Sequence, residues 1–201
     1  MSEFNYFALI LFIISVSFTP GPNNFLLLSS GIKFGLRRTV RHILGILVGF
    51  PLMLILLGIL FHYISSIDPT IFYTFSYIGI LYLLYLAYKI ILSDSTIKDD
   101  PNHQPITFIQ AILFQWVNPK AWIMILSVLS TFISPHESYY EKLFIITILF
   151  IALGSINCFM WAGLGMFIKE RLANRQHMRY INALLGVMLF LAVLQMIPSK
   201  L

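Results

Sequence analysis

The sequence predicts an all-α integral membrane protein whose six transmembrane helices form an inverted 3+3 repeat, with helices one and four broken. The first observation is composition: 59% of residues are hydrophobic and only 10% charged, against about 25% charged in soluble domains. The second is a series of long, continuous apolar runs, whereas membrane strands alternate in segments of about ten residues. The third is a pair of helix-breaking clusters at matching places in the two halves. A soluble globular protein is therefore excluded.

The transmembrane segments are delimited by charged residues, because a charge at the bilayer centre costs at least ~2.5 kcal/mol. About 20 helical residues cross a hydrocarbon core, and each gap between charges is long enough. We expect the first segment to remain in the mature protein, since no basic region precedes it. The spans are expected at about 4–30, 43–64, 70–92, 108–133, 142–168 and 179–197.

The chain is expected to be a single transport domain, 1–201, built from two halves. Repeat one covers about 1–92 and repeat two about 108–201, and the acidic stretch 93–107 reads as a solvated linker. Three spans per half is an odd number, so the second half runs through the membrane in the opposite sense. That is the condition for an inverted repeat.

The orientation follows from the basic residues, since short loops rich in lysine and arginine stay in the cytoplasm. Both termini of a six-span chain lie on one side, and the loops on that side hold only Lys142 and Lys200. The opposite loops hold most of the 13 basic residues, namely Lys33, Arg37, Arg38, Arg41, Lys89, Lys98, Lys169, Arg171, Arg175 and Arg179. We therefore expect both termini outside the cell. This placement accounts for the net charge of +5 without a nucleic-acid partner.

Two helix-breaking clusters interrupt spans one and four. They read Thr19-Pro-Gly-Pro-Asn-Asn24 and Trp116-Val-Asn-Pro-Lys120, and close to half the chain separates them. Proline removes a backbone donor and clashes with the carbonyl four residues earlier, so each cluster should break or kink its helix. A Pro-Gly pair alone is also explained as a packing kink. Two breaks in corresponding positions, each with asparagine, favour a substrate site.

The breaks predict a polar cavity, because freed backbone groups inside a membrane must find partners or line water. A helix that restarts near Pro22 directs partly positive amides toward the break, where they could hold a carboxylate. Lys120 is the charged residue that lies well inside a predicted span, and charged residues in that position usually have a function. The alternative is that its side chain snorkels to the membrane interface. Gln115, Asn157 and several serines could also contact a zwitterion. The predicted substrate-binding residues are Pro20, Gly21, Pro22, Asn23, Asn24, Asn118, Pro119 and Lys120.

These motifs resemble the LysE/RhtB family of amino-acid exporters. The resemblance rests on Phe18-Thr-Pro-Gly-Pro-Asn-Asn-Phe-Leu-Leu-Leu-Ser-Ser-Gly31, a following basic loop, and Asn118-Pro-Lys-Ala121, and it covers essentially the whole chain. The segments Gln115–Lys120, Leu129–Pro135 and Gly154–Trp161 are similar to the branch that exports cysteine and O-acetylserine. The resemblance implies export of a small neutral amino acid or derivative across the inner membrane, driven by the proton gradient.

Other chemistry lacks the residues that it needs. The sequence has no HExxH motif, no paired intramembrane acids and no glycine-rich phosphate loop, so we expect no metal, no cofactor and no enzymatic activity. Cys158 is the single cysteine and reads as a small buried hydrophobe. His42 and His62 have a suitable pKa range for carrying protons, but both flank span two, where a hydrated histidine is commonplace. Two alternative functions remain open, namely transport of another small solute and a non-transporting membrane scaffold. Assembly into a homo-oligomer also remains open.

Overall fold

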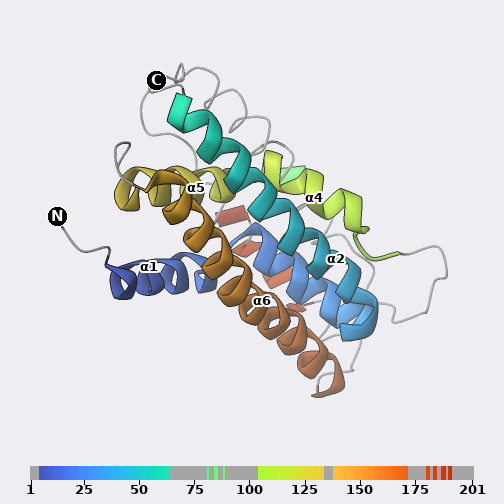
Figure 1. Ribbon diagram of the computed structural model, residues 1–201. Helices are drawn as coiled ribbons and strands as arrows, with labels where there is room; N and C mark the ends of the chain where they lie inside the picture. Colours follow the sequence, from blue (N-terminus) through green and yellow to red (C-terminus); the bar gives the residue numbers. More distant parts are fainter. Residues whose placement is uncertain are drawn as a thin grey trace.

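The computed structural model describes residues 5–63, 104–133 and 138–171, together with isolated positions between 81 and 191. These ranges are helical and contain no strand, as the sequence predicts. Predicted spans three and six and most of the linker 93–107 lie largely outside them, so the six-span repeat remains a prediction. The three described ranges form the helices α1 (Tyr6–Phe18), α2 (Pro22–Tyr63), α4 (Phe108–Val117), α5 (Pro119–Phe132) and α6 (Tyr139–Arg171) (Figure 1).

The first predicted break separates α1 from α2. The Asn5 side chain accepts a hydrogen bond from Ala8 N at 2.9 Å and caps the start of α1. After Phe18 the backbone leaves the helical region at Thr19, with φ of −58° and ψ of 134°. The helix restarts at Pro22, a position where proline is tolerated because its missing N–H has no intrahelical acceptor. The expected span 4–30 is thus two helical pieces with a short interruption between them.

α2 is helical throughout except at Gly35, whose φ is 72° and ψ 172°. The hydroxyl oxygens of Ser30 and Thr39 lie 2.9 Å apart, although nine positions separate the two residues. In a straight helix these residues would be about 13 Å apart along the axis, so the chain turns back on itself at Gly35. Residues 33–41, expected as a basic loop, are instead helical on both sides of a one-residue turn. The positive φ suits glycine, which has no Cβ to clash.

The second predicted break separates α4 from α5, which meet at an angle of 66°. Thr107 and Gln110 form a reciprocal capping box at the start of α4. Asn118 ends α4 and caps α5 at once, since its side chain accepts from Lys120 N at 3.1 Å. Pro119 is then the first residue of α5. The corner results from an asparagine cap followed by a proline, both of which favour the start of a new helix.

Close backbone contacts hold α2 against α6 and α4. A Cβ atom added to Gly31 would lie 2.1 Å from the carbonyl oxygen of Ala162, and one added to Gly165 would lie 2.2 Å from that of Leu28. Gly45 approaches the backbone of Phe108 in the same way. Small residues at helix crossings are typical of membrane proteins, where close van der Waals packing drives helix association.

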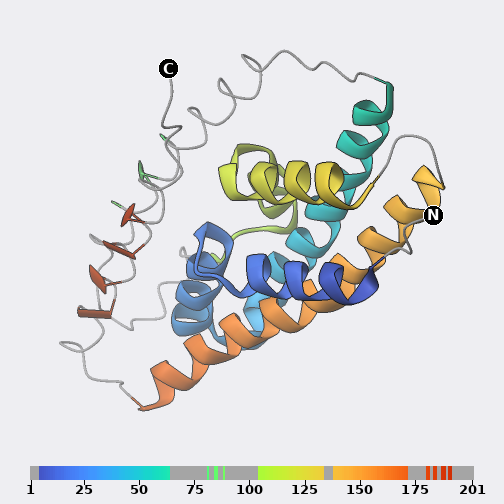
Figure 2. The ribbon, with the colours of Figure 1, turned by 90° about the vertical axis from the view of Figure 1, so that its left-hand side faces the viewer.

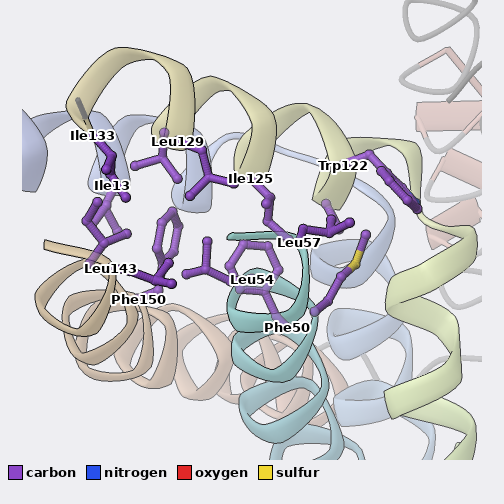
Figure 3. Packing of buried hydrophobic residues seen from close by; sticks show 14 of the residues in the cluster. Ile13, Phe50, Leu54, Leu57, Trp122, Ile125, Leu129, Ile133, Leu143 and Phe150 are labelled. Carbon is purple, nitrogen blue, oxygen red and sulfur yellow. The ribbon is translucent and has the colours of Figure 1, made fainter. Parts of the chain in front are cut away.

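The largest apolar core lies where α5 packs over the part of α2 that follows Gly35 and over the first turns of α6 (Figure 3). Ile125 and Leu129 extend from α5 toward Leu54 on α2, and Phe50 meets Phe150 of α6 with ring centroids 5.0 Å apart. The phenyl rings of Phe12 in α1 and Phe132 in α5 are 5.6 Å apart. The first piece of span one and the second piece of span four are thereby tied to the same core as the long helices.

The outer faces of α2 and α6 are apolar and exposed. Leu44, Val48 and Leu52 on α2 and Phe144 and Ile148 on α6 each expose more than a third of their surface. A contiguous apolar patch of this kind is rare on soluble monomers, whereas lipid acyl chains can cover it without cost. Length and composition make α2 and α6 candidate membrane spans. The bent pair α4–α5 is a third candidate if its two helices are counted as a single span.

The described basic residues of two predicted cytoplasmic segments lie at one end of the bundle. Ile32, beside Lys33, packs in the same cluster as Ile168, beside Lys169, and the turn of α2 and the end of α6 lie together in Figures 1 and 2. At the other end, the Tyr139 hydroxyl donates to Gly58 O at 2.6 Å. This arrangement brings together segments that the expected topology puts on one side of the membrane, while the side itself remains a prediction.

The glycine contacts predict a position-specific loss of stability. Gly31→Ala should destabilise the protein by about 1–3 kcal/mol, because the new methyl group overlaps the α6 backbone, which cannot move aside cheaply. Gly163→Ala is the matched control: it lies on α6 with no atom within 4 Å of its added Cβ, and it should be neutral or slightly stabilising. Thermal unfolding of the detergent-solubilised variants measures both. Equal midpoints would show that the close crossing does not limit stability.

Candidate functional site

The two helix breaks meet in space through polar side chains. Asn23 Nδ2 donates to Gln115 Oε1 at 2.9 Å, and Gln115 Nε2 also donates to Ala111 O. Lys120 Nζ donates to the carbonyl oxygen of Thr19, 101 positions earlier in the chain. Gly21 permits this approach, since an added Cβ would lie 2.7 Å from the Lys120 Cδ atom. Residues from both predicted repeats therefore form one polar centre.

Asn24 pairs the backbone carbonyls that the first break sets free. Its Nδ2 atom donates to Ser17 O at 2.9 Å and to Thr19 O at 3.0 Å. The side chain is buried, with 3% of its surface exposed. Because an unpaired carbonyl in an apolar interior costs about 1–3 kcal/mol, these bonds stabilise the interrupted geometry.

The second break is closed mainly by its own neighbours. Trp122 Nε1 donates across the corner to Trp116 O at 2.8 Å. The two indole rings pack edge to face, with centroids 6.4 Å apart. Together with the Asn118 cap, these contacts fix the α4–α5 corner from residues within one short segment.

Asn157 of α6 extends the polar centre to a third helix. Its Nδ2 atom donates to Asn24 Oδ1 at 3.0 Å. Its Oδ1 atom is buried and has no hydrogen-bond partner. Most buried side-chain oxygens are paired in proteins, so this one is unusual.

A pocket opens beside the two breaks, with about 590 Å³ of atom-free space that is partly open to the surroundings. Its polar wall contains Asn23, Asn24, Asn118, Lys120 and Asn157. Its apolar wall is built largely from α2 and α6, with Phe50, Pro51, Phe150 and Cys158, and from Met124 of α5. A small ligand with two polar ends and a short side chain has complementary surfaces here, because binding pockets combine apolar walls with a few oriented polar groups.

The structure brings five of the eight predicted site residues to this pocket. Gly21, Asn23, Asn24, Asn118 and Lys120 line it. Pro20 is exposed, whereas Pro22 and Pro119 are buried at the first positions of α2 and α5. None of the three prolines is among the lining residues. The prolines therefore shape the breaks, and the asparagines and the lysine face the space between them.

Sequence reasoning gave too little weight to the α6 contribution. Asn157 is one of many polar residues in the apolar spans, and it lies within the segment Gly154–Trp161 that carries part of the family resemblance. Cys158, expected as a small buried hydrophobe, is buried with 3% of its surface exposed and also lines the pocket. A signal that could have identified Asn157 is its strongly polar amide in an otherwise apolar stretch, where Ser155 is the other polar residue nearby.

His42 differs from the expectation of a hydrated residue near a span end. It is fully buried, and neither ring nitrogen has a hydrogen-bond partner. It lies one helical turn before Ile46, which lines the pocket. The side chain of His62 lies outside the described part of the structure.

Comparison with known proteins agrees with the motifs. The sequence pattern described as LysE type translocator matches residues 14–199, nearly the whole chain. The chain belongs to the LysE family. Two of its relatives are named cysteine/O-acetylserine efflux protein: one from Salmonella typhimurium is 33% identical over 85% of this chain and 86% of its own length, and one from Escherichia coli is 31% identical with the same coverage. No solved structure matches the chain.

Membership of the LysE family confirms the resemblance drawn from the motifs at Phe18–Gly31 and Asn118–Ala121. It makes the chain a member of a translocator family rather than of an enzyme family. Membership of a translocator family also agrees with the described helices, because two or three spans among them are long and apolar enough to cross a membrane.

Proposed function

We propose that the protein exports small neutral amino acids or their derivatives, such as cysteine and O-acetylserine, from the cytoplasm across the inner membrane. The observation that carries the proposal is the likeness, over 85% of the chain, to relatives named for cysteine/O-acetylserine efflux. The pocket between two helix breaks supports it, since discontinuous membrane helices are the usual sites for substrates in secondary transporters. The predicted placement, with both termini outside, belongs to this proposal.

The polar wall suits the carboxylate of an amino acid. The Lys120 ammonium is the one cation among the described residues that line the pocket, and it is held close to the first break by the Thr19 carbonyl. A charge-assisted hydrogen bond from an ammonium to a carboxylate is about twice as strong as a neutral one. In our proposal the substrate carboxylate approaches Lys120 and the restarted end of α2.

The apolar wall suits a short side chain. Phe50, Phe150 and Met124 are among its lining residues, and Met124 packs against the cluster that contains both phenylalanines. Methionine adapts to different shapes because it is unbranched and flexible. A wall of this kind accommodates a thiol or an acetyl ester and does not provide a charged partner for a basic or acidic side chain.

Export is tested in cells and in vesicles. Cells that overproduce the protein should release more cysteine or O-acetylserine into the medium than cells with the empty vector, and should tolerate higher internal levels. Amino-acid analysis of the medium measures this, and membrane fractionation verifies insertion. Unchanged external levels across a panel of neutral amino acids would contradict the proposal.

Lys120→Gln should weaken transport about 10- to 100-fold, because it removes the positive charge that faces the substrate carboxylate. Counterflow of labelled L-cysteine in proteoliposomes measures the rate and apparent affinity. Lys169→Gln, in the last turn of α6 and away from the pocket lining, is the matched control and should transport normally. Transport by folded Lys120→Gln protein at the unsubstituted rate would identify Lys120 as a snorkelling residue.

We further propose that export is coupled to proton entry and that His42 carries the proton. An imidazole ring can accept and release a proton, and the buried ring of His42 has two unpaired nitrogens one turn from the pocket wall. Cys158 of α6 packs in one cluster with Ile43, the residue after His42, and with Ile46, one turn further along α2. No aspartate or glutamate is among the lining residues described for the pocket.

An acidic vesicle interior should accelerate uptake of labelled L-cysteine by the unsubstituted protein, since protons then leave as the amino acid enters. His42→Gln should retain counterflow, which needs no net proton movement, and lose the response to the pH gradient. The paired measurement separates coupling from folding, because misfolded protein would lose both. A normal pH response in His42→Gln protein would mean that another group carries the proton.

A further inference from the structure

Asn157 of α6 lines the pocket, and its side-chain oxygen is a hydrogen-bond acceptor without a partner. Its Oδ1 atom has no partner, yet the side chain is buried, with 6% of its surface exposed, and lines the pocket. A buried polar atom without a partner is costly and rare in native proteins, so it calls for an explanation. A ligand donor in the pocket would supply the missing bond.

The hydrogen bonds fix which atom of Asn157 is left unpaired. Oxygen and nitrogen of an amide are distinguished by their partners, and Asn24 Nδ2 lies between two backbone carbonyls, Ser17 O and Thr19 O. Only the NH₂ group can donate to both, so Asn24 Oδ1 must face Asn157. Asn157 then presents Nδ2 to that oxygen, and its own Oδ1 remains as the free acceptor. The orientation is set by carbonyls that the first break releases.

We propose that Asn157 Oδ1 accepts a hydrogen bond from the ammonium group of the transported amino acid and makes the site selective for a free amine. The proposal rests on the proposed function and adds the group that recognises the amino end. It assigns the two ends of the substrate to different helices, with the carboxylate at Lys120 and the ammonium at Asn157 on α6.

Charge and geometry support this division of the pocket. The Lys120 ammonium repels a second cation, so the substrate ammonium must lie away from it. Of the other lining amides, Asn24 and Asn23 use their oxygens within the protein, toward Asn157 and Gln115. The Asn118 oxygen accepts from the backbone of Lys120. Asn157 Oδ1 is therefore the one lining side-chain amide oxygen, in the described structure, that accepts no hydrogen bond within the protein.

The test compares two competitors that differ in the amino group. Full-length protein in proteoliposomes carries out counterflow of radiolabelled L-cysteine under reducing conditions. Unlabelled L-cysteine and 3-mercaptopropionate, which has the same thiol and carboxylate but no amine, compete for the site. The measured quantity is the ratio of their inhibition constants, which reports recognition of the amine and is insensitive to the amount of active protein.

Asn157→Leu should reduce the preference for L-cysteine over 3-mercaptopropionate by about tenfold, the loss expected for one hydrogen bond to a charged group. Asn157→Asp keeps an oxygen at this position and adds negative charge, so it should raise the preference instead. A purely structural role would weaken both competitors by the same factor in each variant. Two variants with opposite expected signs keep the test decisive if one of them fails to fold.

Thr147→Val is the matched control. Thr147 is also buried on α6, but its hydroxyl donates to Leu143 O within the same helix and it does not line the pocket. Its substitution should leave the ratio unchanged. An unaltered ratio in folded, transporting Asn157 variants would overturn the inference alone. Absence of counterflow by the unsubstituted protein with every neutral amino acid tried would overturn the proposed function and this inference with it.

Discussion

A helix that breaks inside a membrane protein must pair the backbone groups that it sets free, and the rest of the described site depends on this constraint. Neither lipid nor an apolar core can supply hydrogen bonds. At the first break, two carbonyls are paired by one asparagine, and that asparagine needs a donor for its own oxygen, which α6 provides through Asn157. The need to satisfy a backbone interruption thus determines which side chains face the pocket and which of their atoms remain available.

Tight helix crossings make this polar centre compatible with a small apolar protein. The part of α2 before Gly35 lies directly on α6, with Gly31 on one side of the contact and Gly165 on the other. Such contacts leave no space for intervening side chains, so the positions of Asn24 and Asn157 relative to each other are set by backbone packing. A polar pair in a membrane protein benefits from this rigidity, because a loosely held partner would leave buried groups unpaired part of the time.

The local features of the fold follow from the sequence, whereas its long-range pairings do not. Proline next to asparagine predicts both breaks, because the effects of proline on helix geometry act within a few residues. The partnership of Asn24 with Asn157 depends on the register of α6 against α2, which glycine contacts set and apolar runs do not reveal. The turn at Gly35 was likewise hidden, since a cluster of basic residues reads as a loop although it continues as helix on both sides.

The two breaks differ in where their stabilising partners come from, and this difference has a consequence for biosynthesis. The α4–α5 corner draws on Asn118 and Trp122, which leave the ribosome together with it. Two partners of the first break, Lys120 and Asn157, are synthesised later, and Asn157 follows Asn24 by 133 positions. At synthesis rates of about 5–20 residues per second, that delay is roughly 7–27 s. During this interval Asn24 can already pair the freed carbonyls of Ser17 and Thr19, but its own side-chain oxygen lacks the donor from α6. Water or the insertion machinery must therefore supply that donor until the second half arrives.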